Sequence, residues 1–458
     1  MEPAVRTSRK ISLSWLPSNK SLLRKLFVLF CGITLVILAF CLRRTSFLDN
    51  GKIHIYDRSP SRHKAANQSS SSIPEKKEEE SARRPGKKIF IAFDYWEQLT
   101  MATENFLDLT ALAAYGGRQV VLPFVKDSKF YGAPTEKGLE TLSLYYNVSA
   151  LNRTLRSRGH GTLISWKEFQ GVCQGKLDVL VHFDYTNLPK SKKYNQTTRA
   201  FFPCNARRRN TLGDLKAERT ICMNVFAVDS VERFENDVIE RLPCIGLAQW
   251  RGINKEASSR AQFNLSGVVP DRMYFTAAAI FFSSRLLQVA RDFIAKRLGP
   301  LFVSAHIRAE NMLKFGITFN NSSSVKKCIS NLTTLVQRYK NVSKALMPLF
   351  LASDFGAHGS FSQRAIVARK NAKSLMKILA PLKPIIFQPS TYSLTDRGAV
   401  AIVEMNIVVS GKRLFVVGGG SFQAWQVNIF LNKTNTGQKK KYAKTKCKNE
   451  LCNMLCGV

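Results

Sequence analysis

Residues 275–431 alternate between short apolar runs and amphipathic helical patterns, and this alternation limits the possible fold more than any other feature of the chain. Strands that alternate with helices form parallel sheets with helices on both faces. The pattern therefore predicts a doubly wound α/β domain. Its expected strands are residues 301–306, 349–352, 384–387 and 413–417, and its expected helices are residues 275–297, 335–346, 365–379, 397–409 and 421–431.

A second α/β unit is predicted nearer the amino terminus. Its expected strand, helix and following strand are residues 89–93, 97–115 and 119–125, and a glycine pair ends the helix. Residues 126–272 show little regular pattern, and we assign them to the same domain. The predicted fold class is α/β, with two Rossmann-like domains, residues 88–272 and 273–458. We expect them to face a cleft and bind a ligand between the carboxyl ends of their strands.

Residues 26–42 form an uncharged apolar run with basic residues on both sides. The run is short for a membrane span but long for the core of a cleaved signal peptide, and it does not end in small residues of the A-x-A type. We therefore predict one transmembrane helix, an uncleaved signal anchor. Residues 1–25 are expected to be a cytoplasmic tail, because basic residues dominate that side. Residues 43–87 are polar and charged, which is typical of a flexible stem.

Ten N-x-S/T sequons follow the apolar run, which indicates exposure to the secretory lumen. They are Asn67, Asn147, Asn152, Asn195, Asn264, Asn320, Asn321, Asn331, Asn341 and Asn432. Eight cysteines also follow it, and an even number in a lumenal chain favours disulfide bonds, whose pairing stays open. A metal site at Cys447, Cys452 and Cys456 is the weaker interpretation, because no histidine lies near them. We predict a single-pass type II protein of the Golgi membrane, or of the ER.

The formal net charge is +37. A nucleic-acid partner is not expected, because the basic runs contain no interleaved aromatic side chains on which bases could stack. Glycosylation and disulfide bonds also count against a cytosolic or nuclear protein. We interpret the charge as that of a solvated lumenal surface.

Two basic side chains are expected at the end of the strand at residues 301–306. In the segment SAHIRAEN, residues 304–311, His306 and Arg308 alternate and therefore project on one side. A guanidinium in this place can bind two phosphate oxygens through parallel hydrogen bonds. It would stabilise a nucleoside diphosphate as that group leaves and gains charge. The alternative is an ordinary pair of residues at a strand end.

Two further strand ends carry groups that suit a nucleotide. Asp354 follows the strand at 349–352 and can accept hydrogen bonds from ribose or guanine, or cap the next turn. Three glycines at residues 418–420 allow backbone N–H groups to approach an anion at the start of a helix. Ser421 can cap that helix, bind phosphate, or do both. A plain tight turn is the alternative.

These three segments, in this order, resemble the GDP-fucose-dependent O-fucosyltransferase-like superfamily, which includes protein O-fucosyltransferases and core α1,6-fucosyltransferases. HIRAEN at residues 306–311 is similar to the family's H-x-R segment, and LASD at 351–354 to its strand that ends in a T/S-D pair. Residues 401–423 resemble its last helix–strand–S-F element. Residues 91–124 resemble its opening strand, loop and helix.

The resemblance implies a two-Rossmann fold of the GT-B type and transfer of fucose from GDP-fucose, with inversion, to a glycoprotein or glycan. It implies no cofactor and no essential metal. Arg308 would match the arginine that binds the diphosphate, and His306 would lie near the nucleotide. Asp354 would contact ribose or guanine. Ser421 and Phe422 would bind the phosphate and flank the nucleotide.

Inversion needs a base for the acceptor hydroxyl, unless the acceptor reacts without one. Glu97 is the candidate, because it is expected at the exit of the first strand, facing the cleft, where some family members place a catalytic glutamate. The alternative is a glutamate that balances the dipole of a helix amino terminus. Glu310 is a second candidate, with a salt bridge to a cleft arginine as its alternative. Family members often carry glycine in the first loop, and residues 94–98 contain none.

Other classes of protein fit less well. A metal-dependent GT-A transferase usually carries a D-x-D motif, and no two aspartates of the chain are two residues apart. A Golgi sulfotransferase needs a phosphate-binding loop after an early strand, and residues 93–98 contain none. Two alternatives stay open: a membrane-anchored lumenal or surface binding module without catalysis, and a Golgi glycosyltransferase that uses another sugar nucleotide.

Overall fold

The computed structural model describes residues 87–95, 97–184, 201–202, 215–225, 228, 230–253, 281–309, 322–342, 347–354 and 363–433. The predicted tail, the signal anchor and almost all of the stem lie outside these ranges. Among the described helices, none combines the length and the apolar character needed to cross a bilayer.

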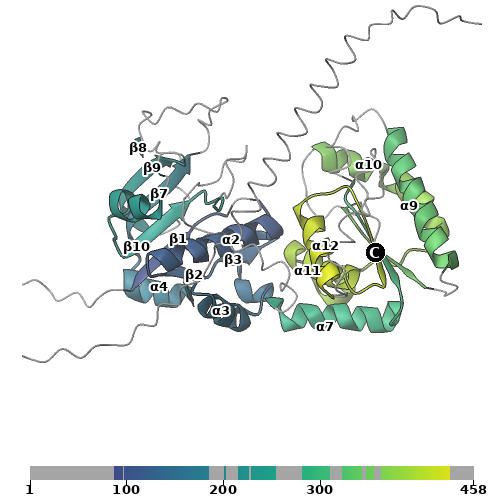
Figure 1. The fold of residues 1–458 in the computed structure, drawn as a ribbon, viewed down its shortest axis with the longest axis horizontal. Helices are drawn as coiled ribbons and strands as arrows, with labels where there is room; N and C mark the ends of the chain where they lie inside the picture. Colours follow the sequence, from purple (N-terminus) through teal and green to yellow (C-terminus); the bar gives the residue numbers. More distant parts are fainter. Residues whose placement is uncertain are drawn as a thin grey trace, which may run out of the picture. The chain divides into compact units, whose positions relative to one another are not determined.

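Parallel β-sheets covered by helices form the frame of the described chain, which confirms the predicted α/β class (Figure 1). The larger sheet has seven strands in the order β6-β2-β1-β10-β7-β9-β8, and all neighbours are parallel except β8 and β9. Its strands are β1 Lys88–Ala92, β2 Arg118–Val121, β6 Leu163–Ile164, β7 Lys176–Asp184, β8 Phe201–Phe202, β9 Lys216–Asn224 and β10 Cys244–Ala248. The stretch with little sequence pattern therefore supplies five strands to the same sheet as β1.

The helices of this part are α2 Leu99–Tyr115, α3 Val148–Ser157, α4 Trp166–Cys173 and the short α5 Val231–Arg233, which continues as a π-helix, η3 Phe234–Val238. Gly116 is the carboxyl-terminal cap of α2, as predicted. The strand predicted at residues 119–125 is wrong as one element. It divides at Pro123, which has no N–H for the ladder, into β2 and β3 Phe124–Lys126. A small antiparallel sheet then joins β3 to β4 Lys129–Tyr131 and β5 Glu140–Thr141, before the single turn η1 Leu142–Leu144.

The second parallel sheet has the order β12-β11-β13. Its strands are β11 Val303–Ile307, β12 Leu349–Ser353 and β13 Arg413–Val417. The helices are α7 Ser284–Phe293 with η4 Ile294–Leu298, α9 Ser322–Val342, α10 Gln363–Leu379 with η6 Ala380–Leu382, the short η7 Pro389–Tyr392, α11 Arg397–Val408 and α12 Ser421–Lys433. In this register His306 lies between Ala352 of β12 and Val416 of β13.

Three predicted elements of this half need correction. The described part of the helix expected at 275–297 begins only at Ser284, and residues 275–280 lie outside the described ranges. Helix α9 begins thirteen residues before its predicted start and ends at Val342. The strand expected at 384–387 is a single bridge between Ile385 and Phe350. Pairing stops there because Pro384 offers no N–H and Phe387 is buried with its ring 5.3 Å from that of Phe293.

Alternation along β11 divides its side chains between two cores. Val303, Ala305 and Ile307 pack with residues of α9 and α10. Ser304 faces the other way and donates a hydrogen bond of 2.6 Å to Val408 O at the end of α11. Figure 1 shows α9 and α10 on one face of this sheet and α11 and α12 on the other. His306, two residues after Ser304, therefore lies on the face of α11 and α12.

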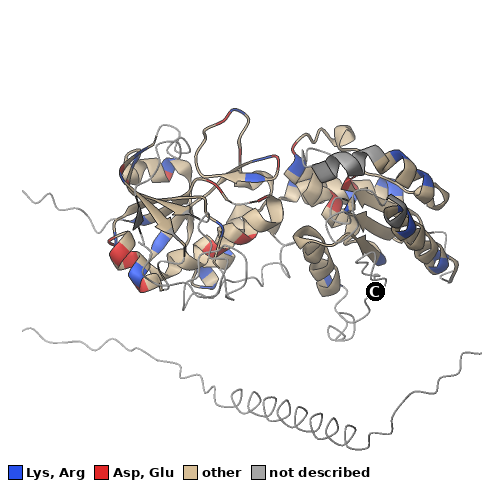
Figure 2. Ribbon diagram, turned by 90° about the horizontal axis from the view of Figure 1, so that it is seen from above, with Lys and Arg blue, Asp and Glu red and all other residues tan. Residues whose placement is uncertain are grey.

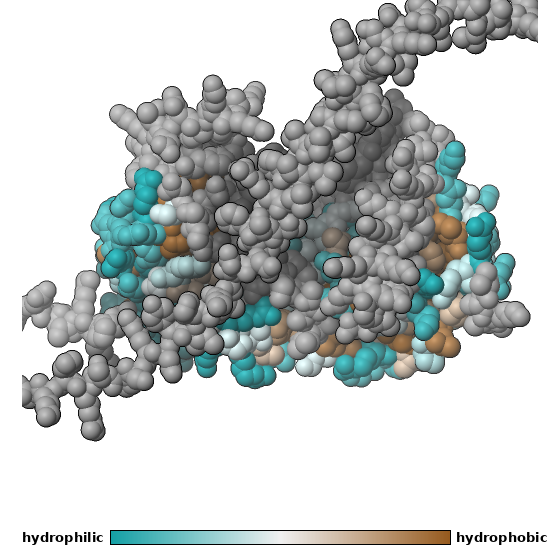
Figure 3. All heavy atoms as spheres, in the orientation of Figure 1, coloured by the Kyte–Doolittle hydropathy of each residue, from teal (hydrophilic) through white to brown (hydrophobic). Residues whose placement is uncertain are grey.

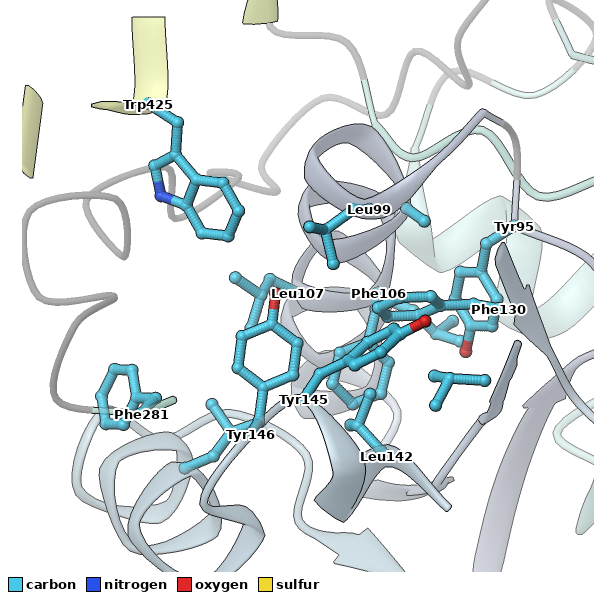
Figure 4. Close-up of a cluster of buried hydrophobic side chains, with 14 of the residues drawn as sticks. Tyr95, Leu99, Phe106, Leu107, Phe130, Leu142, Tyr145, Tyr146, Phe281 and Trp425 are labelled. Carbon is cyan, nitrogen blue, oxygen red and sulfur yellow. The ribbon is translucent and has the colours of Figure 1, made fainter. Parts of the chain in front are cut away.

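A chain of aromatic rings runs from Tyr95, which follows β1, to Trp425 of α12, and Figure 4 labels its members except Phe282. It runs from Tyr95 through Phe130, Tyr145, Tyr146 and Phe282 to Trp425, with consecutive ring centroids 5.9, 6.2, 6.4, 5.7 and 5.7 Å apart. One continuous hydrophobic core thus includes side chains from both parallel sheets.

Polar contacts beside these rings tie the β3–β4 turn to the start of α11. The Tyr145 hydroxyl donates to Asp396 Oδ1 at 2.7 Å, and Asp127 N donates to Asp396 Oδ2 at 2.6 Å. Asp396 also caps α11 by accepting from Ala399 N at 2.8 Å. A Cβ at Gly398 would collide with the Tyr145 ring, so glycine is required for this approach.

Disulfide bonds are present, as the cysteine count predicted. Cys173 at the end of α4 is bonded to Cys244 at the start of β10, 71 positions further along the chain. Cys222 and Cys328 are also disulfide-bonded. Cys447, Cys452 and Cys456 lie outside the described residues.

Basic side chains are concentrated on the part of the molecule that contains α9 and α10 (Figure 2). Helices α9 and α10 contain several Lys and Arg residues and neither Asp nor Glu. The face in Figure 3 mixes hydrophilic and hydrophobic side chains. Among the residues that the structure describes, the exposed large hydrophobic ones are Tyr115, Val172, Leu301 and Ile386, from four separate segments.

A buried ion pair joins β2 of the large sheet to η3. Arg118 at the start of β2 makes two hydrogen bonds to the carboxylate of Glu235, at 2.8 and 2.7 Å. Its guanidinium also donates to Leu242 O at 2.7 Å and lies 4.7 Å from the centre of the Phe90 ring. Both charges are almost fully removed from water, so each depends on the other for compensation.

We predict that Glu235→Gln lowers the free energy of unfolding by about 3–5 kcal/mol, because the buried guanidinium loses its counter-charge. The Arg219–Glu240 pair is the matched control. Its N–O distance is also 2.7 Å, but its side chains are 43% and 53% exposed. Glu240→Gln should cost less than about 1 kcal/mol by urea unfolding. Equal costs for the two variants would contradict the assignment of Arg118–Glu235 as a structural pair.

Candidate functional site

The carboxyl end of β11 is the centre of the candidate site. His306 is its second-last residue and is 8% exposed, and Arg308 follows the strand and is half-buried. Arg308 N donates to Val417 O at 2.8 Å, so the ladder with β13 continues one residue past the strand. The two side chains therefore leave the same face of a backbone that is held in place.

Asp354 holds this backbone from the other side. It is the first residue after β12, and its Oδ1 accepts a hydrogen bond of 2.8 Å from Ala309 N. The bond fixes the main chain directly after Arg308. Asp354 is half-buried.

Three consecutive glycines follow β13, with φ values of 110°, 72° and 115° at Gly418, Gly419 and Gly420. This is a backbone region that other residues adopt rarely. A Cβ at Gly418 would also collide with the carbonyl oxygen of Arg308. The turn before α12 therefore packs Gly418 against the backbone of Arg308 in a way that only glycine allows.

Ser421 is the first residue of α12. Ala424 N donates to Gly420 O at 3.0 Å, which makes Gly420 the residue at the cap position. Of the roles considered for Ser421, the cap position is therefore occupied by Gly420 instead, and phosphate binding stays a prediction. Both Ser421 and the next residue, Phe422, are half-buried.

The ring of His306 lies against the first turn of α12. Its centroid is 5.6 Å from that of Phe422 in an edge-on arrangement, and its Nδ1 is 2.9 Å from Gln423 Nε2. Burial, and then the positive charge of Arg308, lower the pKa of His306 from 6.5 to about 3. The ring is therefore neutral at physiological pH, and Arg308 carries the positive charge of this pair.

Glu97 does not take part in the described contacts around His306 and Arg308. It is exposed, has a φ of 70°, and precedes α2, which begins at Leu99 and not at residue 97 as predicted. The first turn of α2 contains no acidic residue, so Glu97 is not a glutamate within the helix start. Within the described chain, no hydrogen bond or ion pair joins Glu97 to His306 or Arg308. Glu310, the second candidate base, lies outside the described residues.

Two polar residues near strand ends were missed by the sequence reasoning. Gln423 contacts His306, but it is one polar residue in a helix start and nothing in its spacing indicates that contact. Asp94 directly follows the first strand region and accepts a hydrogen bond from Gln249 N, after β10. Burial raises the pKa of Asp94 above its usual value. The position of Asp94 after a buried strand could have indicated it as a candidate site residue from the sequence.

A metal site is not formed by the part of the chain that the structure describes, since no group of three or more His, Cys, Asp or Glu residues gathers there. The groups near Arg308 that could hold a ligand are the guanidinium, the neutral imidazole and the backbone N–H groups at the start of α12. They suit a phosphate or another anion with hydrogen-bond acceptors.

These observations define an α/β protein with parallel sheets, whose β11 ends in groups that suit an anion. The structure resembles crystal structures of POFUT1, a GDP-fucose protein O-fucosyltransferase. POFUT1 in complex with GDP has 14% sequence identity and a TM-score of 0.45, over 75% of this chain and 95% of that chain. POFUT1 in complex with GDP-fucose has 12% identity and a TM-score of 0.45, over 76% and 95%. Comparison with protein-family models and with curated proteins finds no match.

We predict that Gly418→Ala destabilises the protein by more than about 2 kcal/mol, because the added Cβ meets the Arg308 carbonyl and the backbone conformation is strained as well. Gly117→Ala is the control. Gly117 also has a positive φ, of 62°, but a Cβ there would meet nothing within 4 Å, so about 1 kcal/mol is expected. Thermal unfolding of the two variants separates the clash from the strain. Equal losses of stability in the two variants would mean that the backbone at Gly418 shifts to relieve the clash.

We also predict that His306 makes the protein less stable as the pH falls from about 6.5 towards 3. In this window the unfolded chain binds a proton at its histidine and the folded chain does not, because the folded pKa is about 3. The slope from this one group is at most about 1.4 kcal/mol per pH unit. His306→Asn should remove it. Urea unfolding at a series of pH values would contradict the prediction if the variant kept the wild-type slope.

Proposed function

We propose that this protein is a glycosyltransferase that binds a nucleoside diphosphate sugar at the carboxyl ends of β11 and β13. The observation that carries the proposal is the position of Arg308 beside the three glycines and the start of α12. A guanidinium and the amino terminus of a helix both stabilise negative charge, and both lie at the strand edge where open parallel sheets bind nucleotides.

Such a site is suited to a leaving diphosphate. As the sugar–phosphate bond breaks, negative charge grows on the phosphate oxygen next to the sugar. Arg308 is held through its backbone by Val417 and, at the next residue, by Asp354, so its charge does not have to be repositioned during the reaction. A fixed positive charge stabilises the transition state more than the ground state.

GDP-fucose is the donor we propose, on the sequence resemblance of the segments at residues 306–311, 351–354 and 401–423. In this proposal the fold is of the GT-B type, residues 273–458 bind the nucleotide sugar and residues 88–272 form the acceptor side. His306 and Phe422 flank the nucleotide, Ser421 binds phosphate, and Asp354 contacts ribose or guanine. No metal is essential, because Arg308 and the helix start supply the positive potential.

The acceptor would be a glycoprotein or glycan, attacked with inversion at the fucose carbon. Glu97 is the proposed base, since its exposed carboxylate at the exit of β1 could reach an acceptor hydroxyl. We propose a type II protein of the Golgi or ER membrane. The disulfide between Cys173 and Cys244 and the sequons of the chain support a lumenal position for this part.

The test measures binding of GDP, UDP and GDP-fucose to the full-length protein in detergent, by calorimetry, with and without EDTA. We expect GDP and GDP-fucose to bind in EDTA, and Arg308→Ala to weaken binding by about a hundredfold, as the loss of a bidentate charged contact does. Arg413→Ala is the matched control. Arg413 lies on the neighbouring strand at its opposite end and should leave the affinity unchanged.

Other outcomes separate the alternatives. A folded protein that binds no nucleotide would be a binding module without catalysis. Binding of UDP that requires a metal would point to another sugar nucleotide and would overturn the proposed donor. Fucose transfer at an unchanged rate in Glu97→Gln would remove Glu97 from the mechanism.

A further inference from the structure

The amide of Gln423 is buried between two backbone carbonyls and an imidazole. Gln423 is 1% exposed, and its Nε2 lies 2.8 Å from Val417 O, 3.1 Å from His306 O and 2.9 Å from His306 Nδ1. The three contacts come from the ends of two neighbouring strands, and the amide itself comes from the helix that follows one of them.

The two carbonyl oxygens decide which way round the amide lies. A carbonyl oxygen only accepts hydrogen bonds, so the atom that faces both of them must be the nitrogen and not Oε1. The backbone of Val417 and His306 therefore fixes the orientation of this side chain, independently of the ring.

An amide NH₂ group donates hydrogen bonds and does not accept them. The ring nitrogen that faces it, His306 Nδ1, consequently cannot carry the proton, since two donors would then meet at 2.9 Å. In a neutral imidazole the proton must then be on Nε2. A doubly protonated ring would also place an N–H against the amide. The low pKa of His306 agrees with this, and the nearby charge, Arg308, acts in the same direction.

We propose that Gln423 is a positioning residue that fixes His306 as the neutral tautomer protonated on Nε2, so that the site offers the ligand one uncharged hydrogen-bond donor beside Arg308. The role of this donor towards the diphosphate or nucleoside oxygens of a sugar nucleotide rests on the function proposed above. The tautomer itself does not, because it follows from contacts within the chain.

The experiment combines a spectroscopic reading of the ring with ligand binding. Full-length protein carrying ¹⁵N-labelled histidine is examined in detergent by two-bond ¹H–¹⁵N correlation spectra, which distinguish the two neutral tautomers and the imidazolium. The His306 signals are assigned by their loss in His306→Asn. We expect the Nε2–H tautomer at neutral pH in the wild-type protein.

Two variants of Gln423 and one control test the cause. Gln423→Met keeps the volume but removes the donor, and should allow His306 to exchange between tautomers and weaken GDP binding about tenfold. Gln423→Glu puts an acceptor against Nδ1 and should move the proton there. Gln426→Met, one turn later on α12, removes a buried amide that does not touch His306. Gln426→Met should leave both the His306 spectrum and GDP binding unchanged, even if this variant is less stable.

The results separate this inference from the proposed function. A wild-type ring protonated on Nδ1, or a ring whose tautomer is the same in Gln423→Met, would overturn the inference. If the wild-type protein bound no GDP but His306 exchanged between tautomers in Gln423→Met, the positioning role would be supported and the proposed function would be wrong. If Gln423→Glu does not fold, Gln423→Met alone decides the question.

Discussion

The site depends on the main chain at residues 307–309, which is held from both neighbouring strand ends. Arg308 N is bonded to Val417 O of β13, and Ala309 N is bonded to the side chain of Asp354 after β12. Because both bonds use the backbone directly after β11, the direction in which Arg308 leaves the sheet does not depend on a ligand. Preorganisation of this kind is what gives a charged group its value in catalysis.

The same arrangement gives the site two unlike partners for an anion. Arg308 offers a permanent charge, while His306 is kept neutral by its burial and by that charge. If His306 were also charged, it would repel Arg308 and destabilise the site when no anion is bound. A neutral donor beside a cation adds direction to the binding of a ligand without this penalty, and the helix start completes the positive potential.

The regular elements could be predicted from the sequence, and the contacts between them could not. Strand β13 and the start of α11 were predicted to the residue, because an apolar run ends in glycines in one case and Asp396 provides a cap in the other. The break between β2 and β3 could have been predicted, because Pro123 has no N–H for a strand ladder. The contact of Gln423 with His306, and that of Asp127 with Asp396, depend on the register of distant segments. No local pattern contains that information, so neither could be predicted.

The contact between Asp127 and Asp396 also has a consequence for how the chain acquires its structure. The two residues are 269 positions apart, yet Asp127 N completes the carboxylate cap of α11. This contact between the β3–β4 turn and the start of α11 forms only after both sheets have formed and met. Long-range closure of this kind slows folding and lengthens the time in which apolar surface is exposed. During synthesis the amino-terminal half must therefore wait, with its side of the aromatic core uncovered, until more than two hundred further residues have followed.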